Sequence, residues 1–371
     1  RLPALHLTPK STVGIDGFLG NRAGFDAMAI VIPLIRGFAL LPTLHWLCDH
    51  GVAVDAALAS AALPADVVSD PFRPVPLVHA GALLRNATRS FGPDLPCRIV
   101  SSAGNLELAM LGKVGLGART PGELMTRVVA ALPYYSSHEQ VSVRKEQDTY
   151  VISEFFAHRF DPETRHALLQ YASAMVDRIL GMAGDPSPRY LRLEIPPHPT
   201  YGIDHLRNWY GDRVFETKAR GFTAVVDERI LQRPFGSVAR DRISPRGLPD
   251  AMPLRGDGTL SGSVRALLVA MLDADEPLGM RRVVAATGTS ARTFQRQLDA
   301  EGTSFSDLLA EVRRNETLRR LGERRNSIAA IAAELGYADQ ASFTRAFRRW
   351  TGSPPSQFRQ GSPAAGGAAS G

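Results

Sequence analysis

Apolar residues recur at helical spacing along the first third of the chain. The pattern predicts helices over Ile30–His50 and Val54–Ala61, each of which ends at a glycine or proline signal. Further helices are predicted at 76–91, 104–111 and 121–133. We therefore expect this part of the chain to be mainly helical.

The pattern then changes to alternation. Residues Gln140 to Phe156 alternate apolar and polar side chains on both sides of the polar turn Glu146–Asp148, which predicts a β-hairpin. The elements predicted after the hairpin are a helix at Pro162–Met182, a strand at Tyr190–Ile195, a short helix at Ile203–Tyr210, and strands at Val214–Glu216 and Phe222–Val226. Helices followed by mixed strands predict an α+β domain for residues 1–232.

Periodicity stops between Arg233 and Gly262, where prolines and glycines accumulate. This composition is typical of a linker, which we place at 233–260. Residues 261–360 show only helical spacing and predict an all-helical domain. The tail 361–371 consists mostly of Gly, Ala, Ser and Pro, has little to bury, and is predicted to be disordered.

One arrangement occurs twice in the C-terminal domain: a short helix, a glycine turn, and a second helix that carries arginine. Gly288 and Ser290 supply the turn and the helix cap in the first copy, and Gly336 and Asp339 do so in the second. Both copies predict helix-turn-helix units. The candidate base-reading side chains are Arg292, Gln295 and Arg296 in the first copy, and Gln340, Thr344 and Arg345 in the second, with Ala341 small enough for close approach.

These residue types suit the major groove of DNA. Arginine can donate two hydrogen bonds to guanine, and glutamine can pair with adenine through two bonds. The alternative is that both faces are ordinary solvated helix surfaces. Two such units in one small domain favour DNA binding.

The net charge of the 371 residues is +6, and the excess lies in the C-terminal part. Residues 261–360 hold 15 arginines against 11 acidic residues, whereas residues 1–232 are balanced. Such an excess attracts polyanions. The candidate phosphate-binding residues are Ser290, Arg313, Arg319, Arg320, Arg324, Arg325 and Arg348, with a solvated helix face as the alternative.

The run from Ile331 to Arg359 reads IAAELGYADQASFTRAFRRWTGSPPSQFR and resembles the C-terminal signature of AraC/XylS-family transcription regulators. The resemblance implies two helix-turn-helix subdomains, which a long helix at about Ser304–Leu321 joins and whose recognition helices enter successive major grooves. It also implies that Gln340, Ala341, Thr344 and Arg345 read bases in the second groove, and Arg292, Gln295 and Arg296 in the first.

This sequence departs from the family pattern at three positions in the C-terminal domain. Thr287 stands where the family usually has Leu, and Arg314 and Thr317 stand where Leu and Ala are common.

The N-terminal part resembles, less specifically, the arabinose-binding-like effector domain of one branch of these regulators. The similar stretches are Leu47–Gly51, Asp70–Pro71, Leu106–Gly112 and Val214 to Pro234. The resemblance implies a small-molecule effector but does not identify it, because members respond to varied ligands. Small-molecule sites are mostly apolar with a few polar anchors, so the candidate effector-binding residues are Tyr134, Tyr135, Arg207, Trp209 and Tyr210, with core or dimer packing as the alternative.

Metal and enzyme sites have little support in the sequence. His45, Cys48 and His50 do not share one helical face, and no matching cluster occurs elsewhere. The residues that could suggest an enzyme are His158, His166, His198, His205, Glu154, Asp161 and Asp204. No nucleophile elbow, phosphate loop or paired-acid motif accompanies them, so we expect no catalytic residue, metal or cofactor.

The longest apolar runs, Ala27–Ile35 and Gly37–Leu44, are too short for a membrane helix, and only Cys48 and Cys97 are present, so we expect a cytoplasmic protein. The expected function is a one-component, effector-responsive transcription regulator, and the expected partners are promoter DNA, a small-molecule effector, RNA polymerase and a second copy of the chain. The alternatives are an N-terminal domain that only dimerises or docks a protein, and an enzyme fused to a DNA-binding domain.

Overall fold

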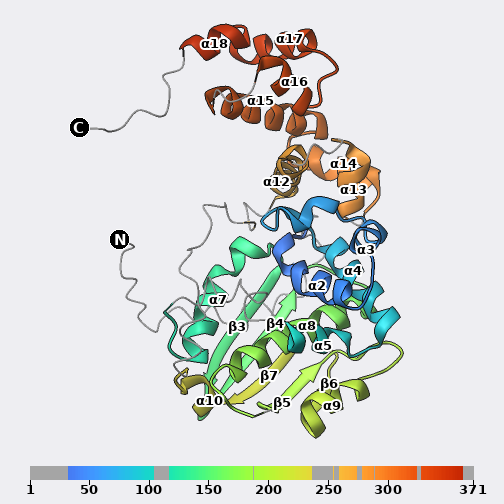
Figure 1. Ribbon diagram of the computed structural model, residues 1–371, viewed down its shortest axis with the longest axis vertical. Coiled ribbons are helices and arrows are strands. Elements are labelled where there is room, and N and C mark those ends of the chain that lie inside the picture. Colours follow the sequence, from blue (N-terminus) through green and yellow to red (C-terminus); the bar gives the residue numbers. More distant parts are fainter. Residues whose placement is uncertain are drawn as a thin grey trace, which may run out of the picture.

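A computed structural model describes residues 32–103, 117–186, 188–235, 254, 259–273, 278–287, 289–323 and 327–361. Most of the predicted linker, residues 362–371 of the predicted tail, the predicted helix at 104–111, Gly288, Arg324 and Arg325 lie outside the described residues, whereas Gly361 is the last residue of a helix. Figure 1 shows an α+β domain below and an all-helical domain above it. The predicted fold class is confirmed.

A five-stranded mixed sheet organises the N-terminal domain. Its strands are β3 (Glu139–Glu146), β4 (Thr149–Phe156), β5 (Tyr190–Ile195), β6 (Val214–Glu216) and β7 (Phe222–Asp227), in the order β3-β4-β7-β5-β6. The predicted hairpin forms β3 and β4, and only β5 and β6 pair in parallel. In the β3–β4 register Val141 lies opposite Glu154, and Glu139 lies opposite Phe156. These four side chains therefore share one face of the sheet.

Helices cover this sheet and form the core with it. They are α2 (Leu41–Asp49), α3 (Val54–Ser60), α4 (Leu77–Phe91), α5 (Leu95–Ser102), α7 (Pro121–Tyr135), α8 (Pro162–Gly181), α9 (Arg207–Tyr210) and α10 (Glu228–Gln232). The 3-10 turns are η2 (Gly37–Leu40), η3 (Ala65–Val68), η4 (Asp204–Leu206) and η5 (Gly211–Arg213). The central helix α8 contacts three strands of the sheet as well as α4 and α5. Asp161 caps α8 by accepting a hydrogen bond of 3.0 Å from the backbone N–H of Thr164.

The prediction of one continuous helix over Ile30–His50 is wrong for the described part of this stretch. The described part of this stretch contains a short strand, β1 (Leu34–Arg36), then η2, and only then α2. β1 pairs antiparallel with β2 (Pro74–Pro76), so its backbone groups bond across to a distant segment. Pro42 lies in the first turn of α2, where a missing N–H costs nothing, and favours a helix start at this point.

The C-terminal domain consists of helices in its described part. These are α12 (Leu260–Asp273), α13 (Met280–Thr287), α14 (Ala291–Ala300), α15 (Phe305–Glu323), α16 (Ile328–Glu334), α17 (Gln340–Thr351) and α18 (Pro355–Gly361). The carboxylate of Glu301 accepts hydrogen bonds of 2.8 Å from the backbone N–H groups of both Leu260 and Ser261. This contact fixes the start of α12 against the end of α14.

The two domains touch through β1, β2 and α4. Ile32 and Leu34 are fully buried and belong to the same hydrophobic cluster as Leu260, Val264 and other residues of the C-terminal core. In addition, β2 contacts α12 and α4 contacts α13, and Figure 1 shows α12 and α13 directly above the blue segments of the N-terminal domain. No helix in the described part of the chain has the length and apolar character needed to cross a membrane.

Candidate DNA-reading helices and an apolar pocket

Each predicted recognition helix begins at a side-chain cap. The Ser290 hydroxyl accepts a hydrogen bond of 3.2 Å from the Thr293 N–H at the start of α14. The Asp339 carboxylate accepts one of 2.6 Å from the Ser342 N–H at the start of α17. Gly336 has φ of +73°, which glycine adopts without steric cost, and it turns the chain between α16 and α17. Both predicted caps and this turn are confirmed.

Helix α14 packs inward through Phe294 and Leu298, which are essentially fully buried. Arg292, Gln295 and Arg296 lie on the exposed side of the helix. Neither arginine has an ion-pair partner among the described residues, so both guanidinium groups can bind an external acceptor.

Helix α17 is anchored by Phe343 and Phe347, which are both 0% exposed. Gln340, Ala341 and Arg345 are exposed on its outer side, and Thr344 is half-buried. The Arg345 guanidinium donates a hydrogen bond of 2.9 Å to the Ser342 hydroxyl. The Thr344 hydroxyl donates to the Gln340 carbonyl (2.8 Å), which leaves the oxygen lone pairs and the methyl group of Thr344 for an outside contact.

Arg320 corrects one prediction, because it is not placed to bind phosphate. It is 9% exposed, and its guanidinium lies 2.8 Å from the Glu334 carboxylate and 3.6 Å from that of Glu316. The positive charge of Arg320 is therefore neutralised inside the domain by these two carboxylates. Its ion pair with Glu334 links α15 to α16.

The other predicted phosphate-binding residues differ in the contacts that their side chains make within the protein. Arg313 lies 5.0 Å from the ring centre of Tyr337 and donates to the Gly336 carbonyl, while Arg319 pairs with Glu316 at 2.7 Å. Arg348 is exposed in the last turn of α17 and has no ion pair within the described residues. Ser290 is exposed, but its hydroxyl caps α14.

The departures from the family pattern at Thr287 and Thr317 are accommodated by internal hydrogen bonds. Both side chains are buried, at 2% and 0% exposure. The Thr287 hydroxyl donates to the Val284 carbonyl (2.7 Å), and the Thr317 hydroxyl donates to the Arg313 carbonyl (2.6 Å). A buried hydroxyl that has a hydrogen-bond partner avoids the cost of desolvation. The core of the domain therefore accommodates both threonines.

An apolar pocket of about 160 Å³ lies inside the N-terminal domain, between β1, α4, α7, α8 and the β3–β4 hairpin. Its wall is mostly aliphatic and aromatic. Ile35, Leu77, Phe156, Tyr171 and Met175 are among its lining residues. A pocket of this kind is the usual form of a small-molecule site.

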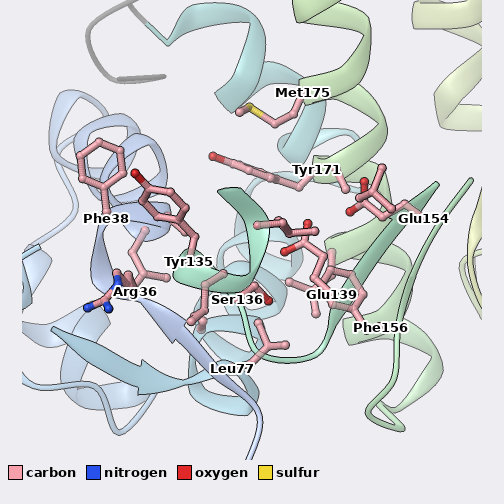
Figure 2. A pocket seen from close by; sticks show the side chains of 18 of the residues that line it. Arg36, Phe38, Leu77, Tyr135, Ser136, Glu139, Glu154, Phe156, Tyr171 and Met175 are labelled. Atoms are coloured by element: carbon pink, nitrogen blue, oxygen red, sulfur yellow. The ribbon is translucent and has the colours of Figure 1, made fainter. Parts of the chain in front are cut away.

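The ionisable acid and base side chains that line the pocket are Arg36 at one side and Glu139 and Glu154 at the other (Figure 2). Arg36 is 6% exposed, and its guanidinium donates to the carbonyls of Tyr134 (2.7 Å) and Phe72 (2.5 Å). Burial lowers the pKa of Arg36. Its charge is thus already solvated by backbone oxygens.

Glu154 is 4% exposed and hydrogen-bonds to the side chain of Glu139. Burial, followed by the nearby charge of Glu139, holds the pKa of Glu154 well above its usual range. Within the described part of the chain, Glu154 Oε1, Tyr135 Oη and Ser136 Oγ have no hydrogen-bond partner, although all three atoms are buried.

Of the five predicted effector-binding residues, Tyr135 lines this pocket. Tyr134 contributes its backbone carbonyl to Arg36. Arg207, Trp209 and Tyr210 lie on α9 and are not among the residues that line it.

Tyr210 and Arg207 of α9 have partners outside the pocket. The Tyr210 hydroxyl is buried 3.8 Å from Cys97 Sγ, and Arg207 pairs with Asp204 and Asp212 at 3.3 and 3.2 Å. Sequence reasoning missed Arg36, Glu139 and the pocket role of Glu154. The available signal was an acid between Ile152 and Phe156 on the inward face of a strand.

Two groups of histidines, considered from the sequence as candidate metal ligands or catalytic residues, have ring contacts or hydrogen bonds within the protein. His50 stacks on Trp46 at 3.6 Å between ring centres, and among the described residues no three His, Cys, Asp or Glu side chains are placed to hold a metal ion. His166, His198 and His205 cluster together, with His166 Nε2 3.0 Å from His205 Nε2 and His166 Nδ1 2.7 Å from the Pro196 carbonyl. Burial lowers the pKa of His166 to about 3 and that of His205 to about 4.

Two family descriptions match the chain. Residues 51–235 match the "Arabinose-binding domain of AraC transcription regulator, N-term", and residues 283–361 match a "Helix-turn-helix domain". The first match runs from α3 to α10 and includes most of the residues that line the pocket, but not Ile35 and Arg36. The second match spans both recognition helices.

Individual proteins are also similar. The HTH-type transcriptional regulator VirS of Mycobacterium tuberculosis is 29% identical over 72% of this chain and 78% of its own length. The ornithine utilization regulator of Pseudomonas aeruginosa is 39% identical over 72 residues, which are 19% of this chain and 21% of that protein. The crystal structure of the transcriptional regulator CdpR from Pseudomonas aeruginosa matches with a TM-score of 0.38 and 20% identity, over 87% of this chain and 98% of that one.

Proposed function

Because the chain belongs to the AraC family of transcription regulators, we propose that it binds promoter DNA through α14 and α17, and that a small molecule in the N-terminal pocket controls this binding. Arg292, Gln295 and Arg296 would read bases in one major groove, and Gln340, Ala341, Thr344 and Arg345 in the next. Arg313, Arg319 and Arg348, together with Ser290, would approach the phosphates. The protein would act in the cytoplasm as a homodimer and contact RNA polymerase at the promoter.

One observation supports the regulatory part of this proposal: β1 and α4 both line the pocket and contact the C-terminal domain. Ile35 lines the pocket, while its neighbour Leu34 belongs to the C-terminal cluster. Helix α4 likewise lines the pocket with Leu77, Ala80, Leu83 and Leu84, and it contacts α13 of the first helix-turn-helix unit.

A ligand that displaces this wall favours one arrangement of the two domains over another. It can shift the equilibrium only by the difference between its affinities for the two arrangements. The expected readout is therefore a change in operator affinity, or in the spacing of the bound half-sites, when the pocket is filled.

The DNA-binding part is tested by selecting binding sites for the full chain from a random DNA library. We expect recovered sequences with two conserved segments about 10 base pairs apart, one for each recognition helix on one face of the duplex. Recovery of sequences without a shared motif would contradict base reading.

The regulatory part is tested by native mass spectrometry of the freshly purified full chain, followed by titration of the selected DNA. A bound molecule that changes operator affinity when it is added back supports the proposal. An N-terminal domain whose occupant leaves affinity, half-site geometry and transcription unchanged would favour the alternative, a domain that only dimerises or docks a protein.

A further inference from the structure

Two segments of the N-terminal domain meet at the end of β4. In the β4–β7 register Glu154 lies opposite Phe222, so the residues that follow β4 lie beside those that precede β7. The Arg220 guanidinium accordingly donates hydrogen bonds to the carbonyls of Ala157 (3.2 Å) and His158 (3.4 Å). Arg220 therefore connects the segment before β7 to the segment after β4.

Two further arginines lie near Arg220. Arg159 directly follows the two carbonyls and is exposed, and Arg165 lies near the start of α8 and is half-buried. We call Arg159, Arg165 and Arg220 the arginine cluster. Burial lowers the pKa of Arg220, and the positive charges of Arg159 and Arg165 lower it further. The three like charges are thus close enough to repel one another, which costs energy.

Acidic side chains do not neutralise the arginine cluster. Within the described part of the chain, no member of the cluster has an ion pair with an acid. The acids at the start of α8 pair with other arginines: Asp161 lies 3.3 Å from Arg85, and Glu163 lies 2.5 Å from Arg89. Nε of Arg165 is buried and has no hydrogen-bond partner among the described residues. The cluster therefore combines excess positive charge with an unused donor.

The loop that carries Arg159 is held by aromatic packing. The Phe160 ring lies 5.9 Å from that of Phe156 and 4.9 Å from that of His158, both edge to face. Burial, followed by the charge of Arg220, lowers the pKa of His158, so this ring is neutral at pH 7. The positive charge of the site comes from the arginines, and the loop places it before any ligand arrives.

We propose that the arginine cluster binds a phosphate group, either free phosphate or the phosphate of a small organic molecule. Guanidinium groups present a planar fork of N–H donors that matches phosphate oxygens in a bidentate geometry. A phosphate monoester carries close to two negative charges at pH 7, which offset most of the charge of three arginines. Because the arginine cluster is absent from the described residues that line the apolar pocket, this site is separate from that pocket and goes beyond the proposed function.

Other anions fit the arginine cluster less well. A carboxylate has one charge and two oxygens, so it satisfies one guanidinium fork and leaves the other two arginines without a partner. The phosphates of duplex DNA carry one charge each and are spread along the backbone. The three arginines instead come from three segments that meet at one place, in a domain whose basic and acidic residues are balanced in number.

The test is calorimetric titration of the full chain, in phosphate-free buffer of low salt, with inorganic phosphate, glycerol 3-phosphate and acetate. We expect a phosphate probe to bind with Kd below about 1 mM and at least about tenfold more tightly than acetate. The tighter of the two phosphate probes identifies the source, the free ion or an ester. Absence of phosphate binding, or equal binding of acetate, would overturn the proposal.

Variants locate the binding. Arg159→Gln combined with Arg165→Gln keeps both side chains polar and leaves the hydrogen bonds of Arg220 in place, and it should weaken phosphate binding at least about tenfold. Arg159→Gln alone removes an exposed charge and should also weaken it. Arg229→Gln, at an exposed position on α10, is the matched control and should bind phosphate as the natural chain does. Phosphate binding that survives the double substitution would refute the assignment.

Thermal unfolding supplies a second readout of the same variants. Phosphate that binds the folded chain should raise its Tm, and this rise should vanish in the Arg159→Gln, Arg165→Gln chain. Circular dichroism checks that each variant is folded. A rise in Tm that is equal in the natural and doubly substituted chains would place the bound phosphate elsewhere.

Two macromolecular ligands are separated by further titrations. Binding of triglutamate more tightly than either phosphate probe would show that the arginine cluster receives an acidic protein segment, and the phosphate proposal would fall. It would fall too if the double substitution weakened binding of unselected duplex DNA while the natural chain bound neither phosphate probe, because the cluster would then contact the DNA backbone.

Discussion

At the residue scale, the arginines of the C-terminal domain divide into those with partners inside the protein and those without. Arg320 is buried against Glu334 and Glu316, whereas Arg296 and Arg348 are exposed. The sequence marks all of them as basic. Only the fold tells which charge is available to DNA, because the acids that neutralise Arg320 come from two different helices.

Arg320→Ala is expected to destabilise the protein. Its removal takes a buried guanidinium away from the carboxylates of Glu334 and Glu316, which should lower the free energy of unfolding by about 1–3 kcal/mol. Urea unfolding of the full chain measures this value. Arg314→Ala, an exposed site on the same helix, is the control and should change it by less than about 0.5 kcal/mol. Equal effects of the two substitutions would count against the internal role of Arg320.

Arg345→Ala is expected to cost about 1–3 kcal/mol of affinity on the selected site and to relax preference at one base position. Arg348→Ala, on the same helix, is the matched comparison. It should weaken selected and random DNA alike and flatten the logarithmic salt dependence by about one unit. Competition binding at several salt concentrations separates the two outcomes. A uniform loss for Arg345→Ala would reassign that residue to phosphate.

At the element scale, the sequence pattern predicted those features that depend on interactions between nearby residues. The β3–β4 hairpin, the helix α8 and the caps of α14 and α17 each depend on residues within one element or its turn. The strand β1 was missed because its stabilising partner, β2, lies about 40 residues away. The pocket shows the same limit: Glu154 stands out in its strand, but Arg36 and Tyr135 come to line the same pocket only through the tertiary fold.

The histidine cluster between α8 and the segment after β5 is expected to make stability depend on pH. Because the folded pKa values of His166 and His205 lie below their ordinary value of 6.5, the unfolded chain binds more protons in the window between. Their contribution to stability is complete above pH 6.5 and is lost as pH falls toward 4 and then 3. Urea unfolding between pH 7.5 and pH 5, values that bracket this onset, measures it.

His166→Gln should reduce this slope, whereas His45→Gln, at an exposed site on α2, should leave it unchanged. An unchanged slope in His166→Gln would show that other groups cause the acid sensitivity.

At the scale of the whole molecule, the two domains share a hydrophobic cluster. Its members come from the start of the N-terminal domain and from the C-terminal domain, which are far apart along the chain. Ile32 and Leu34 enter the core of the helical domain, beside α12. Leu34→Ala should therefore loosen α12 and increase amide hydrogen exchange in Leu260–Asp273. Leu206→Ala, equally buried but within the N-terminal core, is the control that should not do so. If exchange in α12 responds to neither substitution, the shared cluster does not couple the domains.

The alternation along β1 has a consequence for engineering. Neighbouring side chains of this strand face different structures, with Leu34 in the helical core and Ile35 in the pocket wall. A shift of this strand by one residue in its pairing with β2 would exchange the two sets, so register matters here as much as identity. A chimera joined at the linker would also carry the sensor's Ile32 and Leu34 into a foreign α12, and such hybrids require these two positions to be exchanged together with the helical domain.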